Sequence, residues 1–214
     1  MKVKWLGHAC FLITSEAGLK IITDPYPQGS GLSYAPIKEA ADIVTMTHDH
    51  FDHNNVSALP GKPQVITGSG VKTIKGVEFR GINTYHDASL GKERGANTAF
   101  CFSVDGIKIC HLGDLGHRLN QEQIDEIGRI DVLLVPIGGV FTIDAKLAET
   151  VVDDLKPKIA MPMHYKTSKC DWPLNTVEDF VADKKNVKKL NVSEIELKVD
   201  KLPESTEIIV LQPV

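Results

Sequence analysis

The chain has 214 residues, of which 42% are hydrophobic and 24% charged, a composition typical of a globular protein with a substantial core. Its formal net charge of -4 excludes a general affinity for nucleic acid or for anionic membranes. No apolar segment approaches the ~20 residues of a bilayer span, and the amino terminus is predicted to be a strand and not a signal peptide. We therefore expect one cytoplasmic domain covering residues 1–214.

Short apolar segments separated by turn residues predict strands throughout the first half of the chain. The connections between the first three strands are short, which favours antiparallel neighbours. Residues 24–31 are rich in Pro and Gly and predict a long surface loop, and a short helix is expected through Val56 and Leu59. The predicted strands cover residues 2–6, 10–14, 19–23, 43–46, 64–67, 71–74 and 77–83.

The pattern changes in the second half, where strands and helices alternate. After a second loop at residues 87–96, Asp105-Gly106 predicts a hairpin between strands 98–104 and 107–112. Further strands are expected at 132–137, 159–163 and 208–211, and helices at 120–127, 145–155 and 176–183. A strand-rich first half, followed by a second half in which strands and helices alternate, suits two sheets packed between helical layers.

Neither the cysteines nor the lysines form a functional pattern. The one basic cluster, Lys184, Lys185, Lys188 and Lys189, is predicted to be the solvated face of a helix end, so we expect no nucleic-acid and no membrane partner. The cysteines have no Cys-x-x-Cys spacing and mostly lie in apolar segments. We expect buried, reduced thiols at Cys10, Cys101, Cys110 and Cys170.

The densest polar motif follows the predicted strand at residues 43–46. Three imidazoles and a carboxylate occupy six residues: His48, His50, Asp52 and His53. Aimed at one point without a cation, these groups would repel one another or stay unsatisfied, whereas imidazole nitrogen and carboxylate oxygen are both good zinc ligands. We expect His48 and His50 to leave the strand on one side, and Asp52 and His53 to lie on the first turn of the next helix.

Four motifs together resemble the metallo-β-lactamase superfamily of metal-dependent hydrolases, and the resemblance covers nearly the whole chain. They are residues 47–53 (THDHFDH), 84–86 (TYH), 112–116 (LGDLG) and 162–165 (PMHY). The resemblance implies an α/β fold of mixed sheets, a four-layer αββα sandwich. It also implies that His86 and His164 are metal ligands and that Asp114 bridges two metals.

The metal ligands implied by the resemblance divide into two sets. His48, His50 and His86 would bind one cation, and Asp52, His53 and His164 the other, with Asp114 between them. Zinc is the first expectation, with manganese or iron as alternatives. Asp24, which follows the third predicted strand, matches a family position that orders the metal-bearing loop without binding metal.

Two further segments, together with residues 162–165, resemble a branch of small bacterial and archaeal proteins within the superfamily. These segments are residues 7–11 (GHACF), 136–142 (PIGGVFT) and 162–165 (PMHY). The branch includes the ascorbate-6-phosphate lactonase and, more distantly, the phospholipase D that cleaves N-acyl phosphatidylethanolamines. The chain departs from the family at Leu115, where threonine is more frequent, and at residues 94–98, which lack the usual Gly-rich pattern. Both departures concern the substrate more than the metals.

The leading hypothesis is a binuclear hydrolase that acts on a small, anionic ester, lactone or phosphodiester. Two cations lower the pKa of a bridging water toward ~7 and so supply hydroxide at neutral pH. Asp52 is expected to bind metal and accept a proton. The branch resemblance places His8 near the metal pocket, where it either donates a hydrogen bond to an anion or relays a proton, or is simply bonded to loop backbone. His111 is expected to lie in the core or behind the ligands.

Several alternatives remain open at this stage. They are a nuclease or phospholipase-like phosphodiesterase, an iron-dependent oxidoreductase of the same fold, and a metal-binding protein without turnover. Lys92 and Arg94 lie on the second predicted loop, where they either line the mouth of the pocket or are simply solvated. The oligomeric state is open, and a homo-oligomer is compatible with the sequence.

Overall fold

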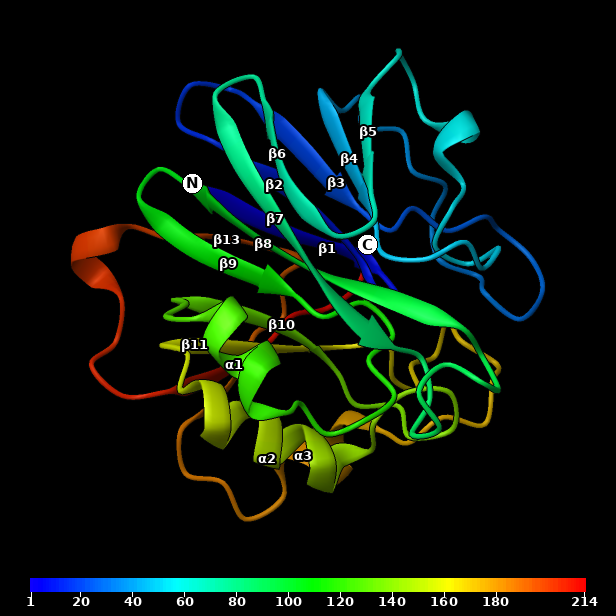
Figure 1. Ribbon diagram of the computed structural model, residues 1–214, viewed down its shortest axis with the longest axis vertical. Coiled ribbons are helices and arrows are strands. Elements are labelled where there is room, and N and C mark those ends of the chain that lie inside the picture. The colour runs from blue at the N-terminus through cyan, green and yellow to red at the C-terminus, as the bar shows by residue number, and fades with distance from the viewer.

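Two mixed β-sheets, stacked face to face, form the centre of the computed structural model, which describes residues 1–214 (Figure 1). In the first sheet, the pairs from β13 to β3 are antiparallel, and β3, β4 and β5 are parallel. Its six strands are, in spatial order, β13 (Glu194–Glu196), β1 (Lys2–Gly7), β2 (Cys10–Thr14), β3 (Lys20–Thr23), β4 (Ile43–Met46) and β5 (Gln64–Thr67). The antiparallel order of β1 to β3 confirms the expectation from their short connections.

The second sheet has eight strands and is parallel on one side and antiparallel on the other. Strands β12 to β9 pair in parallel, whereas β9, β8, β7 and β6 form a meander of antiparallel neighbours. In spatial order they are β12 (Val187–Lys189), β14 (Glu207–Val210), β11 (Ile159–Met163), β10 (Val132–Pro136), β9 (Ile107–His111), β8 (Ala96–Val104), β7 (Val77–Tyr85) and β6 (Gly70–Ile74). The change of direction at β9 is where the hairpins of the first half give way to helical crossovers.

The first sheet is buried on both faces, as alternation along its strands requires. Ile21 of β3 and Ile43 of β4 face the second sheet and join the main core of 45 buried residues. Their neighbours Ile22 and Val44 point the other way and join a separate cluster of 11 buried residues. Successive strand residues point to opposite faces, so each of these apolar pairs contributes to both clusters.

The helices cover the second sheet, and loops cover the outer face of the first. Helices α1 (Gln121–Ile127), α2 (Ala145–Leu155) and α3 (Val177–Val181) lie together below the strands in Figure 1. The first sheet is instead covered by side chains of the loop after β3, such as Tyr26 and Tyr34, beside the short 3-10 helix η1 (Val56–Ala58). The predicted α/β sandwich of mixed sheets is confirmed, with an outer layer on this side built of loops. The longest helix has 11 residues, and no helix is a candidate membrane span.

The carboxyl-terminal segment contains elements that the sequence pattern did not predict. Strands β12 and β13 and the 3-10 helix η2 (Val199–Lys201) were not expected. The prediction that the basic cluster ends a helix was wrong, because Lys188 and Lys189 lie on the edge strand β12 and form ion pairs with Glu207 and Glu178. This strand has only one half-buried apolar residue, so its sequence has no alternation of apolar and polar residues. Its conformation is determined by its pairing with β14.

Gly7, at the end of β1, is required by its surroundings as well as by its backbone. Its φ is 132°, and a Cβ atom would lie 2.5 Å from the Tyr34 ring. Gly18 has a φ of 87°, but a Cβ atom there would meet nothing within 4 Å. Both alanine variants carry a backbone cost, but only Gly7→Ala also overpacks the core. We expect Gly7→Ala to lower the free energy of unfolding by about 1–3 kcal/mol more than Gly18→Ala, measured by denaturant titration. Equal losses would contradict this account.

Candidate metal centre

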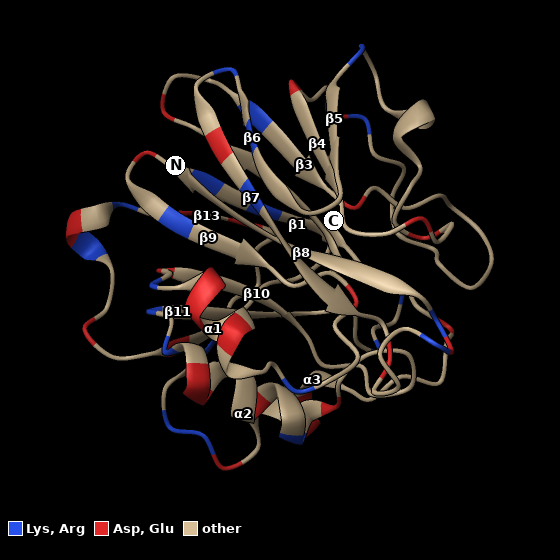
Figure 2. Cartoon of the chain, viewed as in Figure 1, with Lys and Arg blue, Asp and Glu red and all other residues tan.

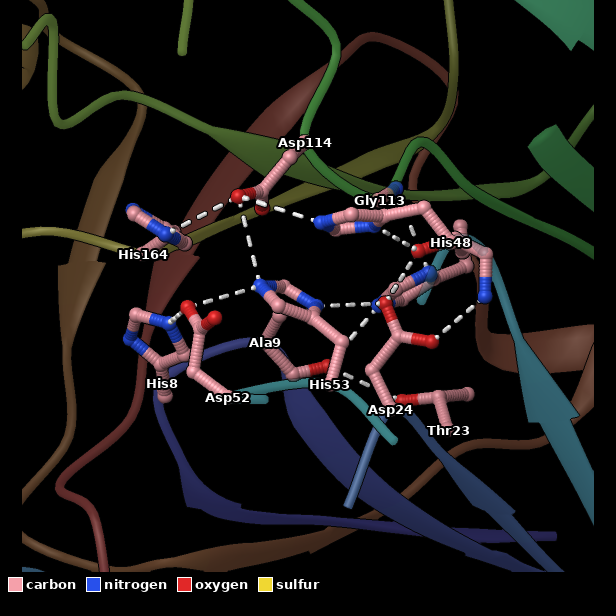
Figure 3. A network of polar contacts seen from close by, with 12 residues as sticks. His8, Ala9, Thr23, Asp24, His48, Asp52, His53, Gly113, Asp114 and His164 are labelled. Atoms are coloured by element: carbon pink, nitrogen blue, oxygen red, sulfur yellow. Dashed lines mark hydrogen bonds and ion pairs between the residues drawn. The ribbon is translucent and has the colours of Figure 1, made fainter. Parts of the chain in front are cut away.

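Six strands end at one edge of the two sheets, and the residues that follow them meet there. β4 leads into the motif at residues 47–53, where the chain turns sharply. Sheet ends are rigid, so they hold side chains with the precision that a metal site demands. The other contributions are His86 after β7 and, as Figure 3 shows, His8 after β1, Asp24 after β3, Asp114 after β9 and His164 after β11. The structure therefore brings together all seven predicted ligands, together with His8 and Asp24.

The first group consists of His48, His50 and His86. Their potential ligand atoms all lie within 4.8 Å of one another. The ring centroids are 4.6 Å apart for His48 and His50, 4.8 Å for His48 and His86, and 4.9 Å for His50 and His86. Three imidazoles at nearly equal separation, two of them buried, have the arrangement of one triangular face of a tetrahedral site.

The second group consists of Asp52, His53 and His164, with His8 beside them. Their potential ligand atoms also lie within 4.8 Å of one another. The His8 Nε2 lies 2.9 Å from Asp52 Oδ2, and His53 Nε2 lies 3.2 Å from the same oxygen. This group differs from the prediction only by the inclusion of His8, whose ring centroid is 4.0 Å from that of His164.

Asp114 lies between the two groups. Its Oδ2 is 3.1 Å from His86 Nε2 in the first group, and 3.2 Å from both His53 Nε2 and His164 Nε2 in the second. One carboxylate oxygen that faces three imidazoles from two groups has the position expected of a bridging ligand. The centre is buried: Asp114 is only 2% exposed and His164 only 1%.

The donor set fits divalent cations. Several buried atoms have no hydrogen-bond partner in the protein, among them the Nε2 atoms of His48, His53 and His164 and the Oδ1 of Asp114. Each such group costs about 1–3 kcal/mol if left unsatisfied, and all four point into the same centre. Imidazole nitrogen and carboxylate oxygen suit zinc, and do not exclude manganese or iron.

The charge states of His48 and Asp114 suit a cation site, and that of His53 responds to the carboxylates around it. Burial is the main cause that lowers the pKa of His48 to about 3, which keeps its ring neutral. Burial alone would raise the pKa of Asp114, but His164 and His53 beside it hold that pKa well below its usual range. Burial would lower the pKa of His53, yet Asp114 and Asp52 raise it well above its usual range. A proton on His53 therefore neutralises charge where a cation would do so, and metal binding would displace it.

Asp24 fixes the tautomers of two of the histidines. Its Oδ1 accepts a hydrogen bond from the Thr47 backbone N–H at 2.8 Å, and its Oδ2 accepts one from the Thr47 hydroxyl at 2.6 Å. The same Oδ2 lies 2.8 Å from His53 Nδ1, and Thr47 Oγ1 lies 3.0 Å from His48 Nδ1. Because the Asp24 carboxylate only accepts, His53 Nδ1–H is the donor to it, and because the Thr47 hydroxyl gives its proton to Asp24, that oxygen accepts from His48 Nδ1–H. The Nε2 lone pair of His48 is then free for a cation, and that of His53 becomes free once a cation displaces its second proton.

Three residues of the centre have backbones that non-glycine residues rarely adopt. The φ angles of His8, Asp24 and His164 are 53°, 36° and 52°. Such conformations cost about 1–3 kcal/mol each and persist only where the surroundings enforce them. Gly116 is required for another reason. It packs directly against the backbone of His86, and a Cβ atom there would overlap the His86 carbonyl carbon.

The structure corrects the predicted position of two residues. Asp52 and His53 do not lie on the first turn of a helix. They lie in a turn closed by a hydrogen bond from His53 N–H to the His50 carbonyl, at 3.0 Å, and the 3-10 helix η1 begins three residues later. The reason is a side-chain hydrogen bond. Asn55 donates to the Tyr26 carbonyl and ties this segment to the loop after β3, and this bond competes with the hydrogen bonds of a helix.

Two supporting residues behind Asp114 complete the centre. Asn97 of β8 accepts a hydrogen bond from the Asp114 N–H at 3.0 Å and donates to the Leu112 carbonyl at 2.9 Å. The prediction missed Asn97, because the predicted strand began at residue 98 and the burial that requires a hydrogen-bonded partner for this amide is seen only in the fold. His111 donates to the Ala9 carbonyl and accepts from Gly113 N–H, so it lies in the core behind the ligands, as expected.

A cavity of about 400 Å³ opens onto the centre. Three aromatic side chains, Phe51, Phe141 and Trp172, and one cation, Arg94, line it together with ligand residues. Lys92 is exposed and does not line the cavity, so of the two basic residues considered from the sequence only Arg94 reaches it. A larger cavity of about 500 Å³ lies beside β7, β8 and β9 and contains no histidine, so it takes no part in this site.

Two stacked mixed sheets with a buried His and Asp cluster at the ends of their strands define a metal-dependent hydrolase of the metallo-β-lactamase fold. The family model described as "Beta-lactamase superfamily domain" matches residues 2–164. The chain therefore belongs to the metallo-β-lactamase superfamily and, within it, to the UPF0173 metal-dependent hydrolases.

The similarity extends over most of the length of each relative. The UPF0173 metal-dependent hydrolase of Thermococcus onnurineus is 30% identical, with 100% of this chain and 97% of the relative covered. That of Archaeoglobus fulgidus is 32% identical over 78% of this chain and 84% of the relative. A crystal structure from Thermotoga maritima, described as a Zn-dependent hydrolase of the superfamily, is 38% identical, has a TM-score of 0.82, and covers 100% of this chain and 99% of its own.

The role of Asp24 can be tested by Asp24→Asn. The amide would have to place an N–H group against Thr47 or His53, which favours the His53 tautomer that has its proton on Nε2. We expect the affinity for zinc to fall by about 10- to 100-fold, measured by competition with a chromophoric chelator. Asp42→Asn, at the opposite end of β3 and β4, where Asp42 accepts from the Lys20 N–H and from Lys75, is the matched control. An unchanged affinity in Asp24→Asn would show that this carboxylate does not control the tautomer.

Proposed function

We propose that the protein hydrolyses a small, anionic ester, lactone or phosphodiester with the help of two divalent cations, of which zinc is the first expectation. The observation that carries this proposal is the position of Asp114, whose Oδ2 lies 3.1–3.2 Å from imidazoles of both groups. A mononuclear site would need only one of the groups. Two complete groups with a shared carboxylate support a binuclear one.

In this proposal each group would hold one cation. His48, His50 and His86 would hold the first and Asp52, His53 and His164 the second, with Asp114 available to both. Such a pair of cations would supply a water with a pKa near ~7 and a Lewis acid for the bond that is attacked. The protein contributes a buried, rigid set of ligands and a cavity that excludes most of the bulk water.

Asp52 is the proton acceptor in the proposed reaction, and His8 orients it. Burial would raise the pKa of Asp52, but His53 beside it holds that pKa far below its usual range, so the carboxylate is ionised. Burial lowers the pKa of His8 to about 4, so its ring is neutral at pH 7. Since Asp52 Oδ2 only accepts, the His8 Nε2 is the donor to it, and this contact orients the carboxylate.

The size of the cavity and the surface charge favour a small substrate. A volume of about 400 Å³ is within the range of small-molecule sites. Figure 2 shows Lys and Arg interspersed with Asp and Glu, and acidic residues gather on α1, which does not suit a polyanionic nucleic acid. The resemblance of residues 136–142 and 162–165 to the ascorbate-6-phosphate lactonase branch supports lactones and phosphorylated esters as the first compounds to test.

The ligand assignment predicts a common effect of His48→Ala and Asp114→Ala. Each variant removes a ligand, so the metal content should fall from two equivalents per chain, and hydrolysis should fall by at least about 100-fold. The measurements are elemental analysis of the zinc-reconstituted protein and rates on bis-p-nitrophenyl phosphate beside a panel of lactones and thioesters. Glu204→Ala, in the exposed loop before β14, is the control. Unchanged rates in both ligand variants would refute the assignment.

Removal of the metal is expected to lower the free energy of unfolding as well as the activity. The orphaned nitrogens and the charge on Asp114 are satisfied by a cation in the native state and by water in the unfolded state. A cation present at about 100 times its dissociation constant stabilises the fold by about 2.7 kcal/mol. For a chain of this size, chelation should lower the Tm by about 5–10 °C, followed by calorimetry, and added zinc should restore it. A Tm that does not respond to chelator or zinc would contradict a bound metal.

A further inference from the structure

Arg94 is the one cationic side chain among the residues that line the cavity over the candidate metal centre. Its guanidinium carbon lies 4.9 Å from the centre of the Phe141 ring, in a cation–π arrangement. Arg94 is exposed to solvent, and this contact orients its guanidinium toward the cavity while leaving its N–H donors unused. Arg94 is thus held at the cavity by an apolar face and not by a carboxylate.

The loop that carries Arg94 is held by a single buried carboxylate. Asp87 Oδ1 accepts hydrogen bonds from the backbone N–H groups of Ser89 and Gly91, at 2.7 and 2.9 Å. Its Oδ2 accepts those of Glu93 and Arg94, at 3.1 and 2.8 Å. Asp87 directly follows His86, so this arrangement ties the Arg94 backbone to the same strand end that supplies a metal ligand. An arginine placed in this way needs little further ordering when it binds a ligand.

The acidic residues around Arg94 are occupied by other partners. Glu93 accepts a hydrogen bond from the Ser89 hydroxyl, Asp49 accepts one from the Asn54 amide, and Asp87 is saturated by backbone N–H groups. The Arg94 side chain takes part in none of the ion pairs or side-chain hydrogen bonds of the chain. A guanidinium that lines a pocket without an internal partner is suited to a carboxylate or phosphate, which it binds in bidentate fashion.

The aromatic side chains form the apolar part of the cavity. Trp172 stands between two edge-to-face neighbours, with ring centroids 6.1 Å from Phe51 and 5.6 Å from Phe141. Its Nε1–H donates to the Ser30 carbonyl at 2.7 Å, which orients the indole. Gly31 allows this position, because a Cβ atom there would lie 2.6 Å from Trp172 Nε1. The cavity therefore has one aromatic wall, with the cation at its Phe141 end.

We propose that Arg94 is the specificity-determining residue of this site. It binds a second anionic group of the substrate, a carboxylate or phosphate, while a planar apolar body between the two ends lies against Phe141 and Trp172. This assignment deepens the proposed function and rests on it for the position of the hydrolysed bond. The substrate class that follows is an aromatic or similarly flat ester or lactone with an anionic group remote from the scissile bond.

The test compares mono- and dicarboxylates of one ring. Benzoate, isophthalate and terephthalate are titrated by calorimetry into the zinc-reconstituted protein, in the wild type and in Arg94→Gln, Arg94→Lys and Lys92→Gln. We expect at least one dicarboxylate to bind the wild type about 10-fold or more tightly than benzoate, because a charge-assisted hydrogen bond contributes about that much. Arg94→Gln should abolish this preference, and Arg94→Lys should restore part of it. Lys92→Gln, which removes the same charge from the same loop but lies outside the cavity, should retain it.

Several results would overturn the inference. These are a dicarboxylate preference that survives in Arg94→Gln, an equal loss in Lys92→Gln, and the absence of any such preference in the wild type, including absence of binding. Failure of the proposed function looks different. In that case the preference for dicarboxylates depends on Arg94 as expected, while the 4-nitrophenyl monoester of terephthalate is not hydrolysed faster than in the Asp114→Ala variant.

Discussion

The structure depends on a concentration of charge that the fold would not tolerate without compensation. Asp24, Asp52 and Asp114 are buried within a few ångströms of several imidazoles, at the edge of a core that excludes water. Burying an ionised carboxylate is costly unless it is paired and hydrogen-bonded. Asp24 is fully satisfied inside the protein, whereas Asp114 is satisfied only by histidines that have unpaired nitrogens of their own. The two carboxylates therefore have different roles. Asp24 holds the neighbouring ligands in place, and Asp114 is suited to bind a cation.

The fold divides this task between the sheets and the loops. Strand ends supply the groups that must be placed with little tolerance, because both sheets are buried and cannot shift easily. The loops after β3 and β7 supply what surrounds the ligands: Tyr34 under Gly7, and Arg94 at the cavity. Loops tolerate substitution better than strands, so related hydrolases can keep one metal centre and change the compounds they accept. Of the positions where this chain departs from its family, Arg94 lines the cavity, whereas Leu115 lies in the core and Asn97 supports Asp114.

Much of the fold and of the site could be predicted from the sequence. Strands with strong alternation or a continuous apolar run, such as β2, β4 and β11, lie where the pattern placed them, because burial on fixed faces determines them. The seven clustered residues could be named because the His-x-His-x-Asp-His motif concentrates metal-ligating groups and the remaining motifs resemble those of one family. Short edge strands such as β12 could not be predicted, since pairing with a distant strand creates them. Asn97 was missed for a similar reason: its partners at Leu112 and Asp114 come close only after β8 and β9 have paired.

The positions of the two tryptophans give the molecule a built-in optical reporter. The buried Trp5 donates from its indole to the His8 carbonyl at 3.0 Å, and Trp172 meets the His8 ring edge-on, with centroids 5.3 Å apart. Every indole of the chain therefore touches the same histidine, one from the core side and one from the cavity side. The tryptophan emission of the protein comes entirely from this neighbourhood. Occupancy of the centre can thus be followed by tryptophan fluorescence in the unlabelled protein. The emission of Trp5 and that of Trp172 are separable by the solvent exposure of each ring.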